Sequence, residues 1–142
     1  MSGRTADDWR RMNDPMIAEF RANDGRVPSR RWPVLLLTTT GAKSGRPYTT
    51  PLNYSTDGNR LVVIASKGGA PAHPDWYRNL VAHPEVTIEL GGETFRARAR
   101  AAEEPERTRL YDQQVAQMPF FDDYRQRVTA RQIPVVVFER LD

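Results

Sequence analysis

The chain has 142 residues, of which 39% are apolar and 27% are charged, and these totals suit a single soluble globular domain. It contains no cysteine, which excludes disulfides, thiolate metal sites and cysteine nucleophiles. The net charge of +3 favours an anionic partner, but acidic residues are interspersed among the arginines, so we predict no nucleic-acid binding. The polar start at Met1–Arg10 is not typical of a signal peptide, and we expect a cytoplasmic protein.

The first expected element is an amphipathic helix over Asp7–Phe20. Its apolar residues recur at steps of three and four, as on one face of a helix: Trp9, Met12, Met16, Ile17 and Phe20. We expect this helix and the loop after it to occupy residues 1–30, and residues 31–142 to form the main domain. The apolar face packs on that domain or lies on a lipid surface, and packing is favoured.

Strand-like segments with turns between them fill the middle of the chain. The expected strands are Val34–Thr40, Thr49–Ser55, Arg60–Ser66, Val86–Leu90, Glu93–Ala101 and Ile133–Leu141. The expected helices are Asp75–Ala82, Pro105–Gln117 and Phe121–Arg131. Because hairpins join most of the strands, the pattern predicts an α+β fold around a small antiparallel sheet or barrel, not a parallel doubly wound sheet.

The segment Thr38–Arg46 has the composition of an anion-binding loop. A strand leads into a turn with two glycines, and glycines allow backbone N–H groups to approach an anion closely. Lys43 adds a positive charge and Ser44 adds a hydroxyl donor, so the segment could hold a phosphate. A plain hairpin turn with solvated cations is an equal alternative.

The segment Ala65–Gly69 repeats this arrangement. A buried strand again ends in a hydroxyl, a cation and two glycines, here Ser66, Lys67 and Gly68-Gly69. Strand ends of a barrel are places where polar groups converge on a ligand, so we expect the two loops to meet at one site. The alternative is a flexible loop with a solvated lysine.

Two further segments are rich in aromatic side chains. Trp76 and Tyr77 could form a wall for a flat ring, although the spacing of Trp76 and Leu80 favours packing into the core. The segment Met118–Tyr124 could line a pocket for an apolar substrate, or could pack on the barrel. The two histidines have no acidic neighbours at ligand spacing, so we predict no metal site.

In order and spacing, these segments resemble the deazaflavin-dependent nitroreductase family, over most of the chain from Val34 to Leu141. The resemblance rests on Leu36–Pro47, Thr50–Leu52, Ala65–Gly69, Pro74–Leu80, His83–Val86 and Ile133–Val137. It implies a split β-barrel with helices packed on it, and reduced coenzyme F420 as the hydride donor. The acceptor would be a small quinone, enone or nitro compound.

The resemblance also implies the residues of the site. The cofactor tail would lie near Lys43 and Ser44, and its ring against the segments at Ala65–Lys67 and Asp75–Asn79. The implied cofactor-binding residues are Ala42, Lys43, Ser44, Arg46, Tyr48, Ala65, Ser66, Lys67, Gly68, Asp75, Trp76, Tyr77 and Asn79. We expect Ser66, Tyr54 and Tyr124 to contact the acceptor. Tyr48 stands where family members commonly carry an arginine or a lysine. The region that matches Met118–Tyr124 is rich in tyrosine in the nitroimidazole-reducing member of the family, and here only Tyr124 remains.

Three other functions compete with this interpretation. The same barrel class accepts FMN, which would make the protein a flavin reductase or oxidase. A non-catalytic module would bind the deazaflavin without turnover. A membrane-associated quinone reductase would place the N-terminal helix on lipid, and a homodimer is compatible with each of these alternatives.

Overall fold

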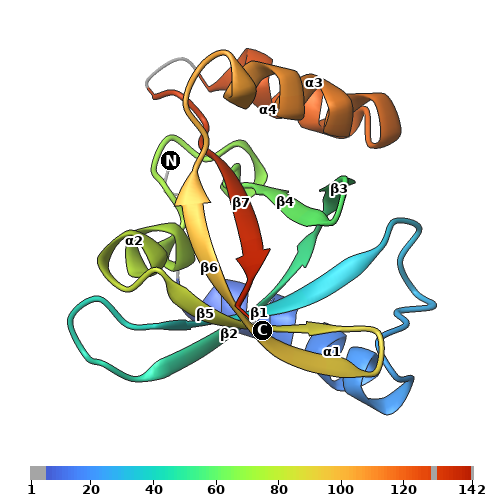
Figure 1. The fold of residues 1–142 in the computed structure, drawn as a ribbon. Coiled ribbons are helices and arrows are strands. Elements are labelled where there is room, and N and C mark those ends of the chain that lie inside the picture. The colour runs from blue at the N-terminus through green and yellow to red at the C-terminus, as the bar shows by residue number, and fades with distance from the viewer. Residues whose placement is uncertain (1–5, 129–130, 142) are drawn as a thin grey trace.

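The computed structural model describes residues 6–128 and 131–141, and its centre is a curled antiparallel sheet of seven strands (Figure 1). The strands are β1 (Val34–Thr40), β2 (Pro47–Asn53), β3 (Ser55–Asp57), β4 (Arg60–Ile64), β5 (Glu85–Leu90), β6 (Glu93–Ala101) and β7 (Val135–Arg140). Their order in the sheet is β2-β1-β5-β6-β7-β4-β3. The edge strands β2 and β3 are consecutive in the chain, with Tyr54 between them, so the sheet curls until its edges meet. The α+β prediction of a split β-barrel is confirmed.

The prediction of one continuous strand over Thr49–Ser55 is wrong. The chain leaves one edge of the sheet at Asn53, which pairs with Val34, and joins the other edge at Ser55, which pairs with Val62. The strand is interrupted at Tyr54, so that β2 pairs with β1 at one edge and β3 pairs with β4 at the other. The predicted strand Arg60–Ser66 also ends early, at Ile64, because the chain then enters a turn.

Four α-helices cover the sheet, together with a short 3₁₀ turn, η1 (Lys67–Gly69). They are α1 (Ala6–Ala22), α2 (Asp75–Ala82), α3 (Glu106–Gln117) and α4 (Phe120–Arg127). The prediction that the last helix continues to Arg131 is too long: the N–H of Val128 makes its final bond, to Tyr124, and Val128 is extended. Residues 129 and 130 of that prediction lie outside the described residues.

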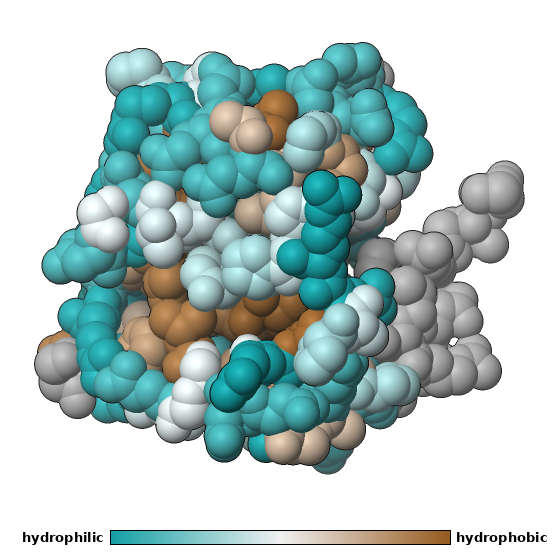
Figure 2. All heavy atoms as spheres, turned by 90° about the vertical axis from the view of Figure 1, so that its right-hand side faces the viewer, coloured by the Kyte–Doolittle hydropathy of each residue, from teal (hydrophilic) through white to brown (hydrophobic). Residues whose placement is uncertain are grey.

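The core has two main parts, on opposite faces of the sheet. Alternate residues of β4 show this, since successive side chains of a strand point to opposite faces. Leu61 and Val63 pack inside the curl of the sheet, whereas Val62 and Ile64 pack under α3 and α4, which lie together at the top of Figure 1. On the face shown in Figure 2, apolar side chains gather in a recess bordered by hydrophilic side chains.

The second half of α1 packs on the sheet. Phe20 is 2% exposed and lies in a cluster with Val34 and Leu36, against which Met16 and Ile17 also pack. These apolar side chains therefore pack on the protein, and the structure gives no support to the membrane alternative for this part of the helix. Over the described residues, no helix is long and apolar enough to cross a membrane. The division of the chain at residue 30 stays a prediction.

Candidate functional site

Five parts of the chain line one cleft with a volume of about 1310 Å³. They are α1, the β1–β2 hairpin together with strand β2, the turn after β4, helix α2 and helix α4. The two glycine-containing loops therefore meet, as the sequence predicted. The predicted site residues that line the cleft are Ala42, Lys43, Ser44, Tyr48, Ser66, Lys67, Gly68, Asp75, Trp76, Asn79 and Tyr124.

Four predicted site residues lie elsewhere. Tyr54 lines a separate hollow of about 610 Å³, so the structure places it away from Ser66 and Tyr124. Tyr77 packs against the core inside the curl of the sheet, where Ala65 is fully buried. Arg46 is exposed on the hairpin and does not line the cleft.

The hairpin between β1 and β2 is a tight turn that carries an exposed cation, Lys43. The N–H of Gly41 donates to the carbonyl of Arg46 at 2.7 Å, and the N–H of Gly45 donates to the carbonyl of Gly41 at 3.0 Å. Within the described part of the chain, no carboxylate pairs with Lys43, which is exposed. Its ammonium group is therefore available to an anion in the cleft.

Two hydroxyl groups extend this hairpin surface. Ser44 Oγ and Tyr48 OH lie 3.0 Å apart and share a hydrogen bond. Tyr48 is 45% exposed and lines the cleft. The hairpin thus offers one charge and two hydroxyl groups to an anion.

Asn79 holds this hairpin against α2. Its Oδ1 accepts a hydrogen bond from the N–H of Ala42 at 3.0 Å, and its Nδ2 donates to Thr39 Oγ1 at 3.2 Å. The side chain is buried, since α2 turns Trp76, Asn79 and Leu80 inward. The sequence predicted that Asn79 contacts the ligand, and the structure shows that both ends of its amide also bind the protein.

The turn after β4 has an unusual backbone. Ser66 is right-handed, with φ −81° and ψ −30°, whereas Lys67, Gly68 and Gly69 have φ of 51°, 62° and 85°. A right-handed residue followed by left-handed ones aligns successive N–H groups into a concavity that suits an anion or a carbonyl oxygen. Ser66 is 6% exposed and its side of the turn lines the cleft.

Aromatic rings of α4 form an apolar wall of the cleft. The ring of Phe121 lies 4.6 Å from that of Phe120 and 5.5 Å from that of Tyr124. Trp32, which the sequence reasoning missed, packs 4.9 Å from Phe120 and donates through Nε1 to the carbonyl of Gln117 at 3.1 Å. Its local sequence carries no signal for this role, because Trp32 reaches α4 from a distant loop.

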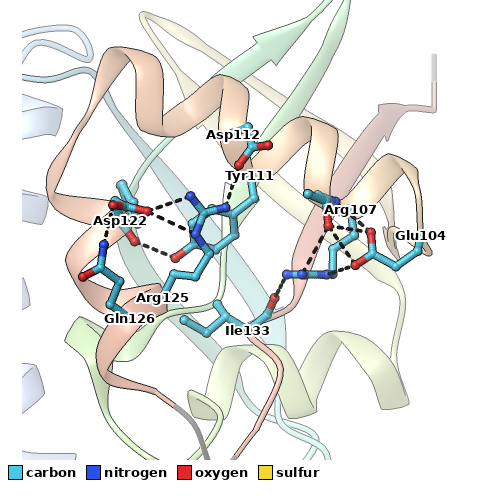
Figure 3. A network of polar contacts seen from close by, with 10 residues as sticks. Glu104, Arg107, Tyr111, Asp112, Asp122, Arg125, Gln126 and Ile133 are labelled. Carbon is cyan, nitrogen blue, oxygen red and sulfur yellow. Dashed lines mark hydrogen bonds and ion pairs between the residues drawn. The ribbon is translucent and has the colours of Figure 1, made fainter.

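A polar network fixes α4 to α3 behind this wall (Figure 3). Tyr111 OH donates to the carbonyl of Phe121 at 2.7 Å, and burial raises the pKa of Tyr111 to about 12, so the hydroxyl keeps its proton. Arg125 stacks on the Tyr111 ring and pairs with Asp112 of α3 at 2.6 Å and with Asp122 at 2.7 Å. The wall is therefore rigidly supported.

The contributions of α1 and of Arg131 to the site were not predicted from the sequence. Asn13, Ile17 and Arg21 of α1 line the cleft, although the pattern predicted only a packing face for that helix. Arg131, which precedes β7, donates hydrogen bonds to backbone carbonyls of the turn after β4. Neither contact follows from local sequence, because each joins parts of the chain that are far apart.

Comparison with known proteins identifies the family. A family model described as F420H(2)-dependent quinone reductase matches residues 9–140. The F420H(2)-dependent quinone reductase Rv1261c of Mycobacterium tuberculosis is 40% identical over 131 residues, which is 87% of this chain and 86% of that protein.

Solved structures agree with this match. An F420-H2 dependent reductase superposes with a TM-score of 0.69 and 36% identity, over 75% of this chain and 93% of its own. A second structure, a domain-swapped dimer, superposes with a TM-score of 0.71 and 32% identity, over 95% of this chain and 100% of its own. The resemblance to deazaflavin-dependent enzymes is confirmed, and the chain belongs to the F420H(2)-dependent quinone reductase family.

Proposed function

We propose that the chain binds reduced coenzyme F420 in the cleft and transfers its hydride to a quinone. The observation that carries this proposal is the convergence of two glycine-containing loops, each with a lysine, and an aromatic wall on one cleft. An enzyme that relies on such a cofactor needs no strong acid, base or nucleophile of its own, because the cofactor supplies the hydride. The protein contributes binding and orientation.

The residues of the cleft fit the cofactor's chemistry. Its tail carries a phosphate, and the unpaired ammonium group of Lys43 with the hydroxyl of Ser44 suits that charge. Tyr48 donates a hydroxyl where relatives commonly place a cation. The flat ring of the cofactor fits between the turn at Ser66 and the side of α2 that carries Trp76.

The wall on α4 suits a planar apolar acceptor. Phe120 and Phe121 offer ring faces, and Tyr124 adds a hydroxyl at the edge of the wall. In this arrangement, Ser66 and Tyr124 donate hydrogen bonds to an acceptor oxygen that gains negative charge as the hydride arrives. An enone or a nitro group also has such an oxygen, and these compounds are the alternative acceptors.

The first experiment is a parallel fluorescence titration with F420 and FMN. Lys43→Ala should weaken F420 binding about 10-fold, since the loss of one charge-assisted contact costs about 1.5 kcal/mol. Arg46→Ala is the matched control: it removes the same charge from the same hairpin outside the cleft, and the affinity should stay nearly unchanged. Equal losses in both variants would mean that only the overall charge matters. Binding of FMN in place of F420 would disprove the cofactor assignment.

Turnover distinguishes an enzyme from a carrier. With F420H2 and menadione, the rate is followed by the fluorescence of the oxidised cofactor. Ser66→Ala should lower kcat about 10-fold through the loss of one hydrogen bond to the transition state. Tyr54→Phe should leave kcat nearly unchanged, because Tyr54 lines a different hollow. Full turnover in Ser66→Ala would disprove its role, and F420 binding without any turnover would favour the carrier.

We also propose a homodimer, on the basis of the dimeric relative that covers 95% of this chain. Light scattering on the eluting protein gives the mass directly, and a mass of 16.2 kDa, that of one chain, would disprove the dimer. Cytoplasmic location and a weak association with membranes remain predictions, and the buried part of the α1 face argues against the second.

A further inference from the structure

The turn after β4 holds a conformation that its own sequence does not stabilise. Lys67 has a φ of 51°, and the left-handed region is sterically disfavoured for a non-glycine residue. Gly68 and Gly69 adopt positive φ freely, but they also leave the unfolded turn more states to sample. Within the turn, two backbone hydrogen bonds hold it, from Gly69 to Ser66 at 3.0 Å and from Ala70 to Lys67 at 3.1 Å. Contacts from outside the turn must supply the remaining stabilisation.

The guanidinium group of Arg131 supplies them. Its Nη1 donates to the carbonyl of Ala65 at 3.1 Å, and its Nη2 donates to the carbonyl of Ser66 at 2.9 Å. The carbonyl of Ala70, at the far end of the turn, accepts from Nη2 at 3.0 Å and from Nε at 3.3 Å. One planar group thus binds both ends of the turn, a fork geometry that a lysine cannot reproduce.

His73 completes the arrangement around Arg131. Its Nδ1 lies 3.0 Å from Nη1 of Arg131. Burial, followed by the charges of Arg131 and Arg78, lowers the pKa of His73, so the ring stays neutral and Nδ1 accepts the hydrogen bond. Over residues 6–128 and 131–141, no carboxylate pairs with Arg131. Its donors are therefore directed at the turn and at His73, and none is used in an ion pair.

The Ser66–Gly69 turn lines the cleft and also contacts its aromatic wall. Ser66, Lys67 and Gly68 line the cleft directly. Gly69 packs against the aromatic wall: a Cβ on Gly69 would lie 3.3 Å from Cδ1 of Tyr124. A shift of the turn would therefore move both the hydroxyl of Ser66 and the ring of Tyr124.

We propose that Arg131 is a positioning residue of the reductase, which fixes the Ser66–Gly69 turn in the geometry that hydride transfer requires. This inference rests on the proposed function of the cleft. Arg131 does not line the cleft and acts through the turn. Misplacement of a reacting group by about 1 Å lowers a rate on the order of 100-fold, and this is the effect expected when the tether is lost.

The first test uses the protein without cofactor. In Arg131→Met, the amides of Gly69 and Ala70 should exchange with deuterium at least ten times faster, because their acceptors Ser66 and Lys67 lose their fixed position. Arg107→Met is the matched control: Arg107 also donates to a backbone carbonyl next to β7, that of Ile133 at 2.9 Å, but it does not touch the turn. Exchange at Gly69 and Ala70 should be unchanged in the control. Unchanged exchange in Arg131→Met would overturn the inference.

The second test separates positioning from general stability. With F420H2 and menadione, Arg131→Met should lose kcat on the order of 100-fold, with little change in the KM for the quinone, whereas Arg107→Met should keep its kcat. Millimolar guanidinium should restore part of the kcat of Arg131→Ala, and equal concentrations of sodium chloride should not. A kcat that falls equally in both arginine variants, or that guanidinium does not restore, would overturn the inference.

If Arg131→Met does not fold, Arg131→Lys keeps the charge without the fork, and it should show faster exchange at the turn and a lower kcat; normal values of both would overturn the inference. If the unaltered protein does not oxidise F420H2 with a quinone, the proposed function fails. The exchange experiment then still decides whether Arg131 holds the turn.

Discussion

Replacement of Asn79 by alanine should destabilise the fold by a predictable amount. The substitution removes two hydrogen bonds, to Ala42 and to Thr39, each worth about 1 kcal/mol net. Thr39 is 1% exposed, so its hydroxyl is left without this partner in the core, at a further cost of about 1 kcal/mol. The sum is about 2–3 kcal/mol, which corresponds to a fall in Tm of roughly 5–10 °C for a chain of this length.

Urea unfolding of Asn79→Ala, Thr39→Val and the double variant measures the expected coupling. Since the two side chains share one hydrogen bond, the double variant should be less destabilised than the sum of the single variants by about 1 kcal/mol. Additive effects of Asn79→Ala and Thr39→Val would refute the reasoning.

Three further predictions concern the hairpin, the α4 wall and the surface charges. Gly41→Ala should weaken F420 binding about 10-fold in a titration, because its Cβ would collide with Oγ of Ser44 and lie 2.7 Å from Cε2 of the Tyr48 ring, so that both cleft side chains must move. Tyr111→Phe should lower the free energy of unfolding by about 1–2 kcal/mol in urea, because the carbonyl of Phe121 loses its partner; no loss would contradict that role. Hydrogen bonds from arginines lower the pKa of Asp57 below 3.8, so the stability it provides should be present at neutral pH and fall as the pH drops below about 4. Acid titration of Asp57→Asn should show a weaker fall, and identical curves would refute it.

The strands and helices were largely predictable because their signals are local. Alternation and apolar runs gave β1 with its observed bounds, and a step of four between Trp76 and Leu80 gave α2. The break at Tyr54 was not predictable from such signals. Residues on both sides of it favour strands, and the break arises because the strands before and after it pair at opposite edges of the sheet.

The candidate site divides in the same way. Glycines and cations at two strand ends, as at Lys43 and Lys67, predicted two loops that converge, and both line the cleft. Trp32 and Arg131 could not be assigned from sequence, because they act through contacts with segments 85 and 65 residues away. Tyr54 showed the opposite error: it was expected to contact the acceptor, but it lies between β2 and β3 and lines another hollow.

The joint at Tyr54 has a consequence for how the barrel opens. It divides the chain into a part that carries the hairpin with Lys43 and a part that carries Ser66, α2 and α4. The ladder between β1 and β5 joins the two parts through three residue pairs, and the bond between Ala42 and Asn79 joins them beside the cleft. A ligand that is bound by both loops therefore contacts both parts and stabilises their association. By linkage, F420 should suppress separation of the parts, and with it any exchange of them between two copies, in proportion to its occupancy.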